Sequence, residues 1–476
     1  MVIQLTYAPQ TIRIQAARVL DEILLLIPRH LPNSGSLQSE VQHRVLDVLS
    51  HQVILVSANQ QTSTDVELRR MGLETLHQIL QAAGHTLVVG WEIIFKMLES
   101  VCWQHNIISA VTSKVGQSES TESFAQGNGS TGRLLKAKPF PLQIGLGNPT
   151  EKSYNALVKI AFQSLTLVCD SVSSLSPEHL RLCIGTLGQF GRQTDTNIAL
   201  TAAASLLWSV SDAIQSKRKN VDDEPQYSAL WMFLLLEVLG LCTDPRAEVR
   251  DGAIQTLFRT MQLYGATLSA ETWDQCIRQI TLPLLQSLTE EIRKLAEPGT
   301  RHDRGMTQAW DESKILALTS VGSIFSDFLV SKIMFLDSFT KAWDVFVGHV
   351  EDTVLFENRI ISPHAFRCLE RGVKALANAE GVFKVRVTES LERAWQAIDR
   401  LGKLVMERLV PGEDLDSSPN QPLTQEALIA YVEVIQSMRN TSKNIHGKEW
   451  DLSRLERLMV ILRGMSVKFV SLSFLL

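Results

Sequence analysis

Hydrophobic residues recur at steps of three and four from Val249 to Met261, which is the spacing of one face of an α-helix. The positions of this stripe are Val249, Ala253, Ile254, Leu257, Phe258 and Met261. Asp244 and Pro245 come before it and are typical of a helix start, because an aspartate oxygen accepts free N–H groups of a first turn and proline suits the first position. Gly265 follows and predicts a left-handed cap at the end of the helix.

A second helix is expected directly after the first. Ser269 can cap its start, and hydrophobic residues again follow at helical spacing. Its predicted buried positions are Trp273, Ile277, Ile280, Leu284 and Leu285. The two segments together predict a helical hairpin of about forty residues.

The same pattern occurs four times along the chain. It reads aliphatic residue, arginine, two spacers, small residue, three spacers, leucine. The matching sets are Ile12, Arg13, Ala16 and Leu20; Leu68, Arg69, Gly72 and Leu76; Ile198, Ala199, Ala202 and Leu206; and Val249, Arg250, Ala253 and Leu257. The set at Ile198 has Ala199 in place of the arginine, and the set at Leu68 places Gly84 where the last set has Gly265. Repeated helical hairpins of this length, without the alternation of strands, predict an all-α fold, an α-solenoid of HEAT/armadillo-like antiparallel helix pairs.

Composition divides the predicted solenoid into segments. Residues 1–111 form N-terminal HEAT-like repeats, and residues 112–152, rich in Ser, Gly, Thr and Pro, form a disordered linker. Residues 153–410 form the main array, 411–423 a second linker, and 424–476 the C-terminal helices. The chain ends on the apolar run VKFVSLSFLL, which is typical of a truncated array.

The recurring arginines form the candidate structural site. A charged residue near each helix start can bond to carbonyls or to an aspartate of a neighbouring repeat, so Arg13, Arg69, Asp244 and Arg250 are interpreted as a ladder between repeats. The alternative is a row of arginines that binds a ligand.

No pattern of catalytic residues is found. The motifs G-x-S-x-G, H-E-x-x-H and the phosphate-binding G-x-x-x-x-G-K-[ST] are absent. The glycines of GTLGQFG, residues 185–191, do not match a dinucleotide site and are better explained by close helix packing. The eleven histidines do not cluster at metal-ligand spacing, and the six cysteines include no C-x-x-C pair. We therefore expect no enzyme activity, no cofactor, no metal site, and reduced cysteines in the core.

Charge and hydropathy narrow the classes of partner. The chain has 46 Lys and Arg against 51 Asp and Glu, a net charge of −5, which disfavours nucleic acid as a partner. No secretory signal is evident, and the most apolar run, residues 230–242, is interrupted by Glu237 and is too short to span a bilayer. A cytoplasmic protein is expected, with peripheral membrane contact still open.

Several segments resemble a known family. The stretch DPRAEVRDGAIQTLF, followed by YGATLSAETWDQCIRQITLPLL, resembles the HEAT-type repeats in the C-terminal part of the large Arf exchange factors and their relatives. Within that group it is most similar to the Mon-two (monensin-sensitivity two) family of Golgi and endosome trafficking scaffolds. The residues that carry this likeness are Asp244, Pro245, Arg246, Val249, Arg250, Ala253, Gln255, Thr256, Leu257 and Phe258, and LLWSVSDAI (206–214) and KAWDVFVGHVE (341–351) fit the same family.

The resemblance implies a function that composition alone does not. It implies a non-enzymatic scaffold, peripheral on trans-Golgi and endosome membranes, that acts in vesicle and protein transport. The implied partners are a Dopey-like scaffold, an Arl/Arf-type small GTPase and a phospholipid flippase. The catalytic Sec-seven exchange domain of the related factors is not recognisable, so the chain would be a C-terminal fragment or a short gene model of such a protein. Two alternatives stay open: the C-terminal regulatory region of a true Arf exchange factor, and a generic HEAT-repeat transport adaptor.

Overall fold

The computed structural model of the chain is built from helices. It describes residues 8–30, 35–54, 62–102, 149–217, 224–296, 304–379, 381–410, 416, 420–447 and 450–470. Within these ranges the elements are α-, 3-10 and π-helices without a strand, which confirms the predicted all-α class. Most of the predicted linker 112–152, up to residue 148, lies outside the described residues, as does most of the predicted linker 411–423.

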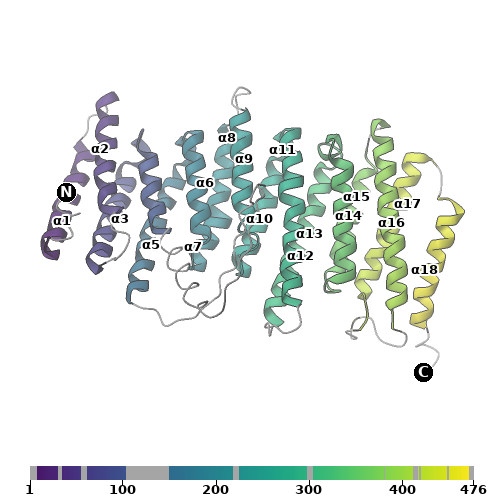
Figure 1. Cartoon of the computed structure of the whole chain (residues 1–476). Coiled ribbons are helices and arrows are strands. Elements are labelled where there is room, and N and C mark those ends of the chain that lie inside the picture. The colour runs from purple at the N-terminus through teal and green to yellow at the C-terminus, as the bar shows by residue number, and fades with distance from the viewer. Residues whose placement is uncertain are drawn as a thin grey trace, which may run out of the picture. The chain divides into compact units, whose positions relative to one another are not determined.

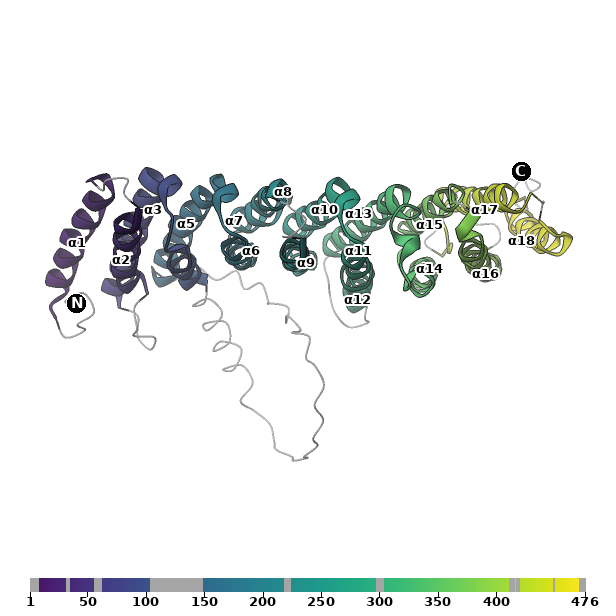
Figure 2. The same ribbon diagram turned by 90° about the horizontal axis from the view of Figure 1, so that it is seen from above.

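The chain forms two compact units, Met1–Ala202 with Asp212–Lys217, and Ala203–Ser211 with Arg218–Leu476. The helices of the first unit are α1 (Gln10–His30), α2 (Gly35–Val53), α3 (Ser63–Ala83), the 3-10 turn η2 (Gly84–Thr86), a helix over 91–102, α5 (Pro149–Asp170), the turn η3 (Val172–Ser174), α6 (Pro177–Gly191) and α7 (Thr196–Leu200). In this unit α1 packs on α3 and α3 on α5, and Figure 2 shows α3 and α5 in one layer with α2 and α6 in a second.

The second unit repeats the arrangement. Its helices are α9 (Glu224–Leu239), α10 (Ala247–Tyr264), the 3-10 turn η6 (Gly265–Thr267), α11 (Ala270–Gln275), the π-helix η7 (Cys276–Thr281), α12 (Leu282–Ala296), α13 (Arg304–Phe328), the 3-10 turn η8 (Ile333–Phe335), α14 (Phe339–Phe356), α15 (Ser362–Leu376), the 3-10 turn η9 (Gly381–Phe383), α16 (Lys384–Arg408), α17 (Gln425–His446) and α18 (Leu452–Val470). The helices α10, α13, α15 and α17 pack one on the next in one layer, and α12, α14, α16 and α18 do so in the other (Figures 1 and 2).

The hairpin of α10 to α12 shows how well the pattern predicts burial. The residues of both predicted stripes, from Val249 to Met261 and from Trp273 to Leu285, are buried. Ser269 caps the second helix as expected, because its hydroxyl accepts a hydrogen bond from the backbone N–H of Thr272 at 3.2 Å. The buried stripe therefore forms the core between the paired helices.

Two local predictions for this hairpin are wrong. The first helix begins at Ala247, not at Pro245, because the carboxylate of Asp244 accepts the N–H of Arg246 at 2.9 Å instead of reaching the helical turn. Gly265 has a φ of −57° and is not left-handed. The chain continues there as the turn η6, and the indole N–H of Trp273 donates to the Gly265 carbonyl at 2.9 Å.

Two further features concern the apolar parts of the chain. By length and composition, one described helical stretch, Thr196–Lys217, could cross a membrane, and 56% of its most apolar window is buried inside the structure, as in the core helix of a repeat protein. All six cysteines are free and buried. Burial raises the pKa of the thiols of Cys276 and Cys368 to about 12, which makes them poor nucleophiles.

Candidate functional site

Arg250 lies in the first turn of α10 and is fully buried. Its Nη1 donates to the carbonyl of Asp244 at 2.8 Å, and its Nη2 donates to the carbonyl of Ala309 at 3.0 Å. Its Nε donates to the hydroxyl of Ser313 at 2.7 Å, and the guanidinium carbon lies 3.9 Å from the centre of the Trp310 ring. Three of these groups belong to α13, so one side chain joins the first helix of one hairpin to the first helix of the next.

The charges around Arg250 suit this role. Burial lowers the pKa of Arg250, while the negative charges of Asp251 and Asp244 oppose the shift, and an arginine stays charged in either case. The Ser313 hydroxyl accepts a hydrogen bond from Arg250 Nε and donates one to the carboxylate of Asp251. The buried cation is therefore surrounded by acceptors from both helices, as a desolvated charge requires.

Arg13 makes a comparable contact in the first unit. It lies on α1 and donates from Nη2 to Asp65 of α3 at 2.7 Å, with both side chains largely buried. Asp65 also takes part in the cap of α3, where it accepts the N–H of Thr62 at 3.1 Å. Burial by itself would raise the pKa of Asp65, but the hydrogen bonds from Arg13 and Thr62 outweigh it and the pKa is lowered.

Arg69 and Asp244 are placed differently. Arg69, on α3, donates from Nη2 to the carbonyl of Ser100 at 3.2 Å, within its own hairpin, and burial lowers its pKa. The carboxylate of Asp244 binds Arg246, and only its backbone carbonyl accepts from Arg250. The structure thus places each arginine against groups of its own unit, and we propose that these contacts hold successive helices together as a ladder.

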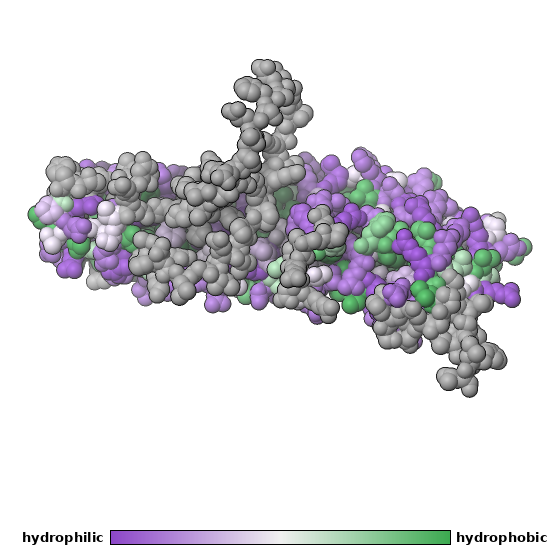
Figure 3. Space-filling view, turned by 60° about the horizontal axis from the view of Figure 1, so that its bottom comes forward, coloured by the Kyte–Doolittle hydropathy of each residue, from purple (hydrophilic) through white to green (hydrophobic). Residues whose placement is uncertain are grey.

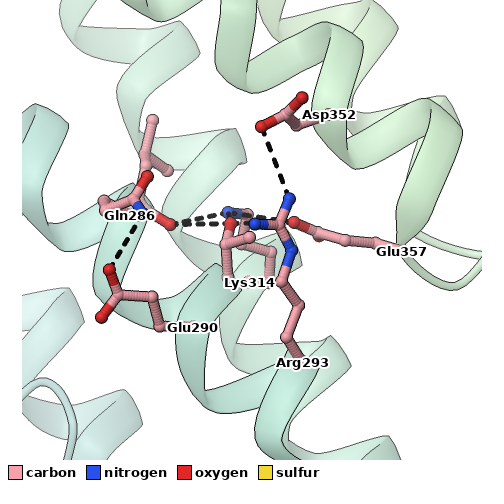
Figure 4. Close-up of polar contacts among 8 residues, drawn as sticks. Gln286, Glu290, Arg293, Lys314, Asp352 and Glu357 are labelled. Carbon is pink, nitrogen blue, oxygen red and sulfur yellow. Dashed lines mark hydrogen bonds and ion pairs between the residues drawn. The ribbon is translucent and has the colours of Figure 1, made fainter. Parts of the chain in front are cut away.

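Lys314 of α13, which was not singled out from the sequence, is buried between α13 and the helices α12 and α14 (Figure 4). Lys314 donates from Nζ to the carbonyl of Leu285 at 2.8 Å and to the hydroxyl of Thr289 at 2.6 Å. The Thr289 hydroxyl donates in turn to Oε1 of Glu357 at 2.8 Å, and that oxygen lies 3.6 Å from Lys314 Nζ. The side chains of Lys314 and Glu357 are both 0% exposed, so this ion pair is shielded from water.

The surroundings of the pair shift the pKa of two groups. Burial lowers the pKa of Lys314, and the charge of Glu357 opposes that shift. Burial and the positive charge of Lys314 lower the pKa of His349 on α14 to about 4, so His349 is neutral near pH 7. At the rim of the cluster Arg293 lies 3.5 Å from Asp352, and Gln286 donates to Glu290 at 2.9 Å (Figure 4).

A signal for Lys314 was present in the sequence. Trp310, Ala317 and Val321 are buried on α13 and are spaced by seven and four residues, and Lys314 lies four after the first and three before the second. A lysine at such a position interrupts the apolar stripe, and a buried lysine needs acceptors from other helices. The identity of Glu357 as partner depends on the packing of α14, which periodicity does not specify.

These groups bind the protein's own polar atoms. Each arginine and Lys314 donates to backbone carbonyls, hydroxyls or carboxylates of neighbouring helices. In the part of the chain that the structure describes, no group of three or more His, Cys, Asp or Glu side chains is arranged to hold a metal ion. These contacts can hold neighbouring helices in fixed positions, as the contacts between the repeats of a repeat protein do.

Comparison with known proteins relates the chain to a family. Residues 218–388, which include Arg250 and the Lys314 cluster, match the family model described as the C-terminal region of Mon2 protein. The chain is 27% identical over 349 residues to a protein MON2 homolog of Drosophila melanogaster, covering 67% of this chain and 18% of that protein. It is 30% identical over 221 residues to a protein MON2 homolog of Caenorhabditis briggsae, covering 44% of this chain and 13% of that protein.

More distant likenesses extend beyond that family. The ARF guanine-nucleotide exchange factor GNOM of Arabidopsis thaliana is 23% identical over 194 residues, covering 38% of this chain and 13% of that protein. Among solved structures, a circular tandem repeat protein with novel repeat topology aligns over 92% of each chain with a TM-score of 0.36 and 12% identity.

The region of similarity is a small part of the relatives. This chain spans less than a fifth of the length of the two MON2 homologs. The family model and both homologs nevertheless agree with the expected resemblance, which is confirmed. Residues 218–388 match the C-terminal region of Mon2 protein, and the chain is similar to Mon2 homologs and, more distantly, to an Arf exchange factor.

Proposed function

We propose that the chain is a non-enzymatic helical-repeat scaffold that acts, within a longer protein, in vesicle-mediated transport between the trans-Golgi network and endosomes. The observation that carries this proposal is the match of residues 218–388 to the C-terminal region of Mon2. The side-chain chemistry agrees with it, because the buried charged groups bind neighbouring helices and are arranged as structural links.

Its partners would be proteins that bind the surface of the stacked helices. By resemblance these are a Dopey-like scaffold, an Arl/Arf-type small GTPase and a phospholipid flippase. A repeat array offers many helix ends and faces in a row, so several weak contacts can add to one firm association. The protein would work on the cytoplasmic side, bound peripherally to Golgi and endosome membranes.

The test is affinity purification of the full-length parent protein from membrane and cytosolic fractions. We expect a Dopey-like protein to be recovered with it, and to be lost when residues 218–476 are deleted. Failure of every Dopey-like protein to associate with the parent would sink the proposed role.

The likeness to GNOM favours one alternative, that the chain is the regulatory C-terminal part of an Arf exchange factor. Two measurements separate the proposals. A Sec-seven domain encoded upstream of Met1 would favour the exchange factor. The purified chain should leave the rate of nucleotide exchange on Arf-type GTPases unchanged, because exchange needs a surface that displaces Mg²⁺ and the β-phosphate. Measurable acceleration of exchange by the chain alone would reject the scaffold hypothesis.

A further inference from the structure

In both units, several helices are followed by a short 3-10 turn. The turns η2, η3, η6, η8 and η9 follow α3, α5, α10, α13 and α15. In the first three the exposed positions are polar or small, as with His85, Ser173 and Ala266. An apolar tip is therefore not a requirement of the turn itself.

The last two turns differ, because their exposed side chains are apolar. Phe335 of η8 is 59% exposed, and Val382 of η9 is 86% exposed. Val385, in the first turn of α16, is 69% exposed, and Phe383 packs edge-on against Phe335 with ring centres 4.7 Å apart. Phe335, Val382, Phe383 and Val385 are named here the turn patch. An exposure of 86% means that hardly any protein covers the tip, so the patch projects from the surface and does not line a groove.

The two turns are held together as one surface. Arg386 of α16 donates from Nη1 to the carbonyls of Met334 and Leu336, the latter at 3.1 Å. Its Nη2 also lies 4.0 Å from the carboxylate of Asp337. Arg386 lies on the helix that follows η9 and binds the carbonyls of the middle residue of η8 and of the residue after η8, so the apolar tips of the two turns lie side by side.

Two exposed lysines lie close in sequence to the turn patch. Lys384 adjoins η9 and Lys341 lies in the first turn of α14, both exposed and both without an ion pair among the described residues. Of the acidic residues near it that the structure describes, Asp337 lies 4.0 Å from Arg386 and Glu389 lies further along α16, while Glu380, directly before η9, is outside the described residues. Exposed apolar side chains next to unpaired lysines match the interface of an anionic bilayer, which takes up the apolar groups and attracts the cations.

We propose that the turn patch docks the protein on an anionic lipid membrane, with Val382, Val385 and Phe335 entering the headgroup boundary and Lys341 and Lys384 facing lipid phosphates and carboxylates. This deepens the proposed function, on which it rests, by assigning a direct membrane contact to particular residues. A groove for a partner helix would hold its apolar residues in a concave, half-covered site, whereas the tips here are the most exposed apolar side chains of their helices.

Vesicle flotation with the purified 476-residue chain tests the proposal. The chain should float with vesicles of phosphatidylcholine and phosphatidylserine and much less with phosphatidylcholine alone, and added salt should weaken the binding. Val382→Asn with Val385→Asn should lower the partition coefficient at least about tenfold, since two apolar groups no longer enter the interface. Lys341→Gln and Lys384→Gln should each lower it about fivefold on the anionic vesicles only.

The matched control removes two exposed apolar residues from the opposite ends of the same helix pairs. Met306 in the first turn of α13 and Ile360 between α14 and α15 are 45% and 56% exposed. That edge comes forward in Figure 3, where hydrophobic atoms lie in separate patches among hydrophilic ones. Met306→Asn with Ile360→Asn should leave flotation unchanged, and circular dichroism should show the same helix content in all variants.

Three results would overturn the membrane assignment: no binding to anionic vesicles, equal loss in the control variant, or unchanged binding after the Val382 and Val385 changes. If the valine variant binds vesicles normally but the parent protein loses a protein partner, the turn patch is a protein site instead. If the chain fails in flotation while the parent protein still recovers a Dopey-like protein, that outcome rejects this inference but leaves the proposed function standing.

Discussion

Lys314 Nζ lies 3.6 Å from Oε1 of Glu357, and neither side chain reaches solvent. The pair joins the middle of α13 to the end of α14, and Thr289 of α12 bridges the two charges through its hydroxyl. Burying the two charges costs desolvation energy for each of them. Replacing both residues therefore has a different effect on stability from replacing only one.

Replacing only one residue of the pair should lower the free energy of unfolding far more than replacing both. Lys314→Met leaves the Glu357 carboxylate buried without its cation, and we expect the free energy of unfolding to fall by about 3–5 kcal/mol. Lys314→Met combined with Glu357→Leu should recover most of that loss. Chemical denaturation of the three proteins measures it. Equal loss in the single and double variants would mean that the two charges do not act on each other.

His349 predicts a dependence of stability on pH. Its pKa falls from the ordinary 6.5 to about 4, because burial and the charge of Lys314 disfavour the imidazolium. Between these values the unfolded chain binds more protons than the folded one, so stability rises as pH rises from about 4 to 6.5 and is lost as pH falls through that window. Above pH 6.5 this difference in pKa contributes on the order of 3 kcal/mol to the free energy of unfolding, relative to acid pH.

The measurement is the unfolding midpoint of the native chain and of His349→Gln at pH 7 and pH 5. Glutamine does not titrate, so the variant should lose less stability between the two pH values than the native chain does. Parallel pH profiles would show that other groups, and not His349, cause the acid sensitivity.

Arg250 predicts a local weakening between two hairpins. Arg250→Ala leaves the Ser313 hydroxyl and the Ala309 carbonyl without their donor and removes the contact with Trp310, so stability should fall by about 3 kcal/mol. Hydrogen exchange should accelerate first in the initial turns of α13. The exposed Arg278 serves as control, because Arg278→Ala removes only a surface pair with Asp274 and should leave exchange unchanged. Normal exchange in Arg250→Ala with lost partner binding would make the arginine a ligand site instead.

The hydrophobic pattern predicts the fold because each repeat buries one stripe. Val249 to Met261 and Trp273 to Leu285 are buried as the spacing requires, and Ser269 caps its helix, since stripe and cap both depend on residues close in sequence. The prediction of where α10 begins is wrong, and the reason is also local. Arg246 competes for the Asp244 carboxylate with its backbone N–H and its guanidinium, which shifts the start to Ala247.

The candidate site depends on contacts across the sequence. Arg250 was singled out by recurrence, but its acceptors Ala309 and Ser313 lie about sixty residues away and belong to no shared motif. Lys314 and Glu357 are brought together by three helices, and nothing in either segment specifies the other. Periodicity identifies a buried face, whereas the partner of a buried charge follows from how the helices stack.

Gly265 and Gly84 occupy the same position in two copies of the pattern. Replacing each with alanine should nevertheless change stability in opposite directions. Both have a right-handed φ, −57° and −56°, which alanine adopts readily. A Cβ at Gly265 would lie 2.7 Å from the Trp273 ring and 2.8 Å from the Phe328 ring, whereas at Gly84 it would meet nothing within 4 Å. Gly265→Ala should therefore lower stability by about 1–3 kcal/mol through overpacking. Gly84→Ala should raise it by about 0.5–1 kcal/mol, because the unfolded chain loses freedom. Thermal unfolding of the two variants beside the native chain measures both signs, and a stabilised Gly265→Ala protein would show that the two rings can move apart at little cost.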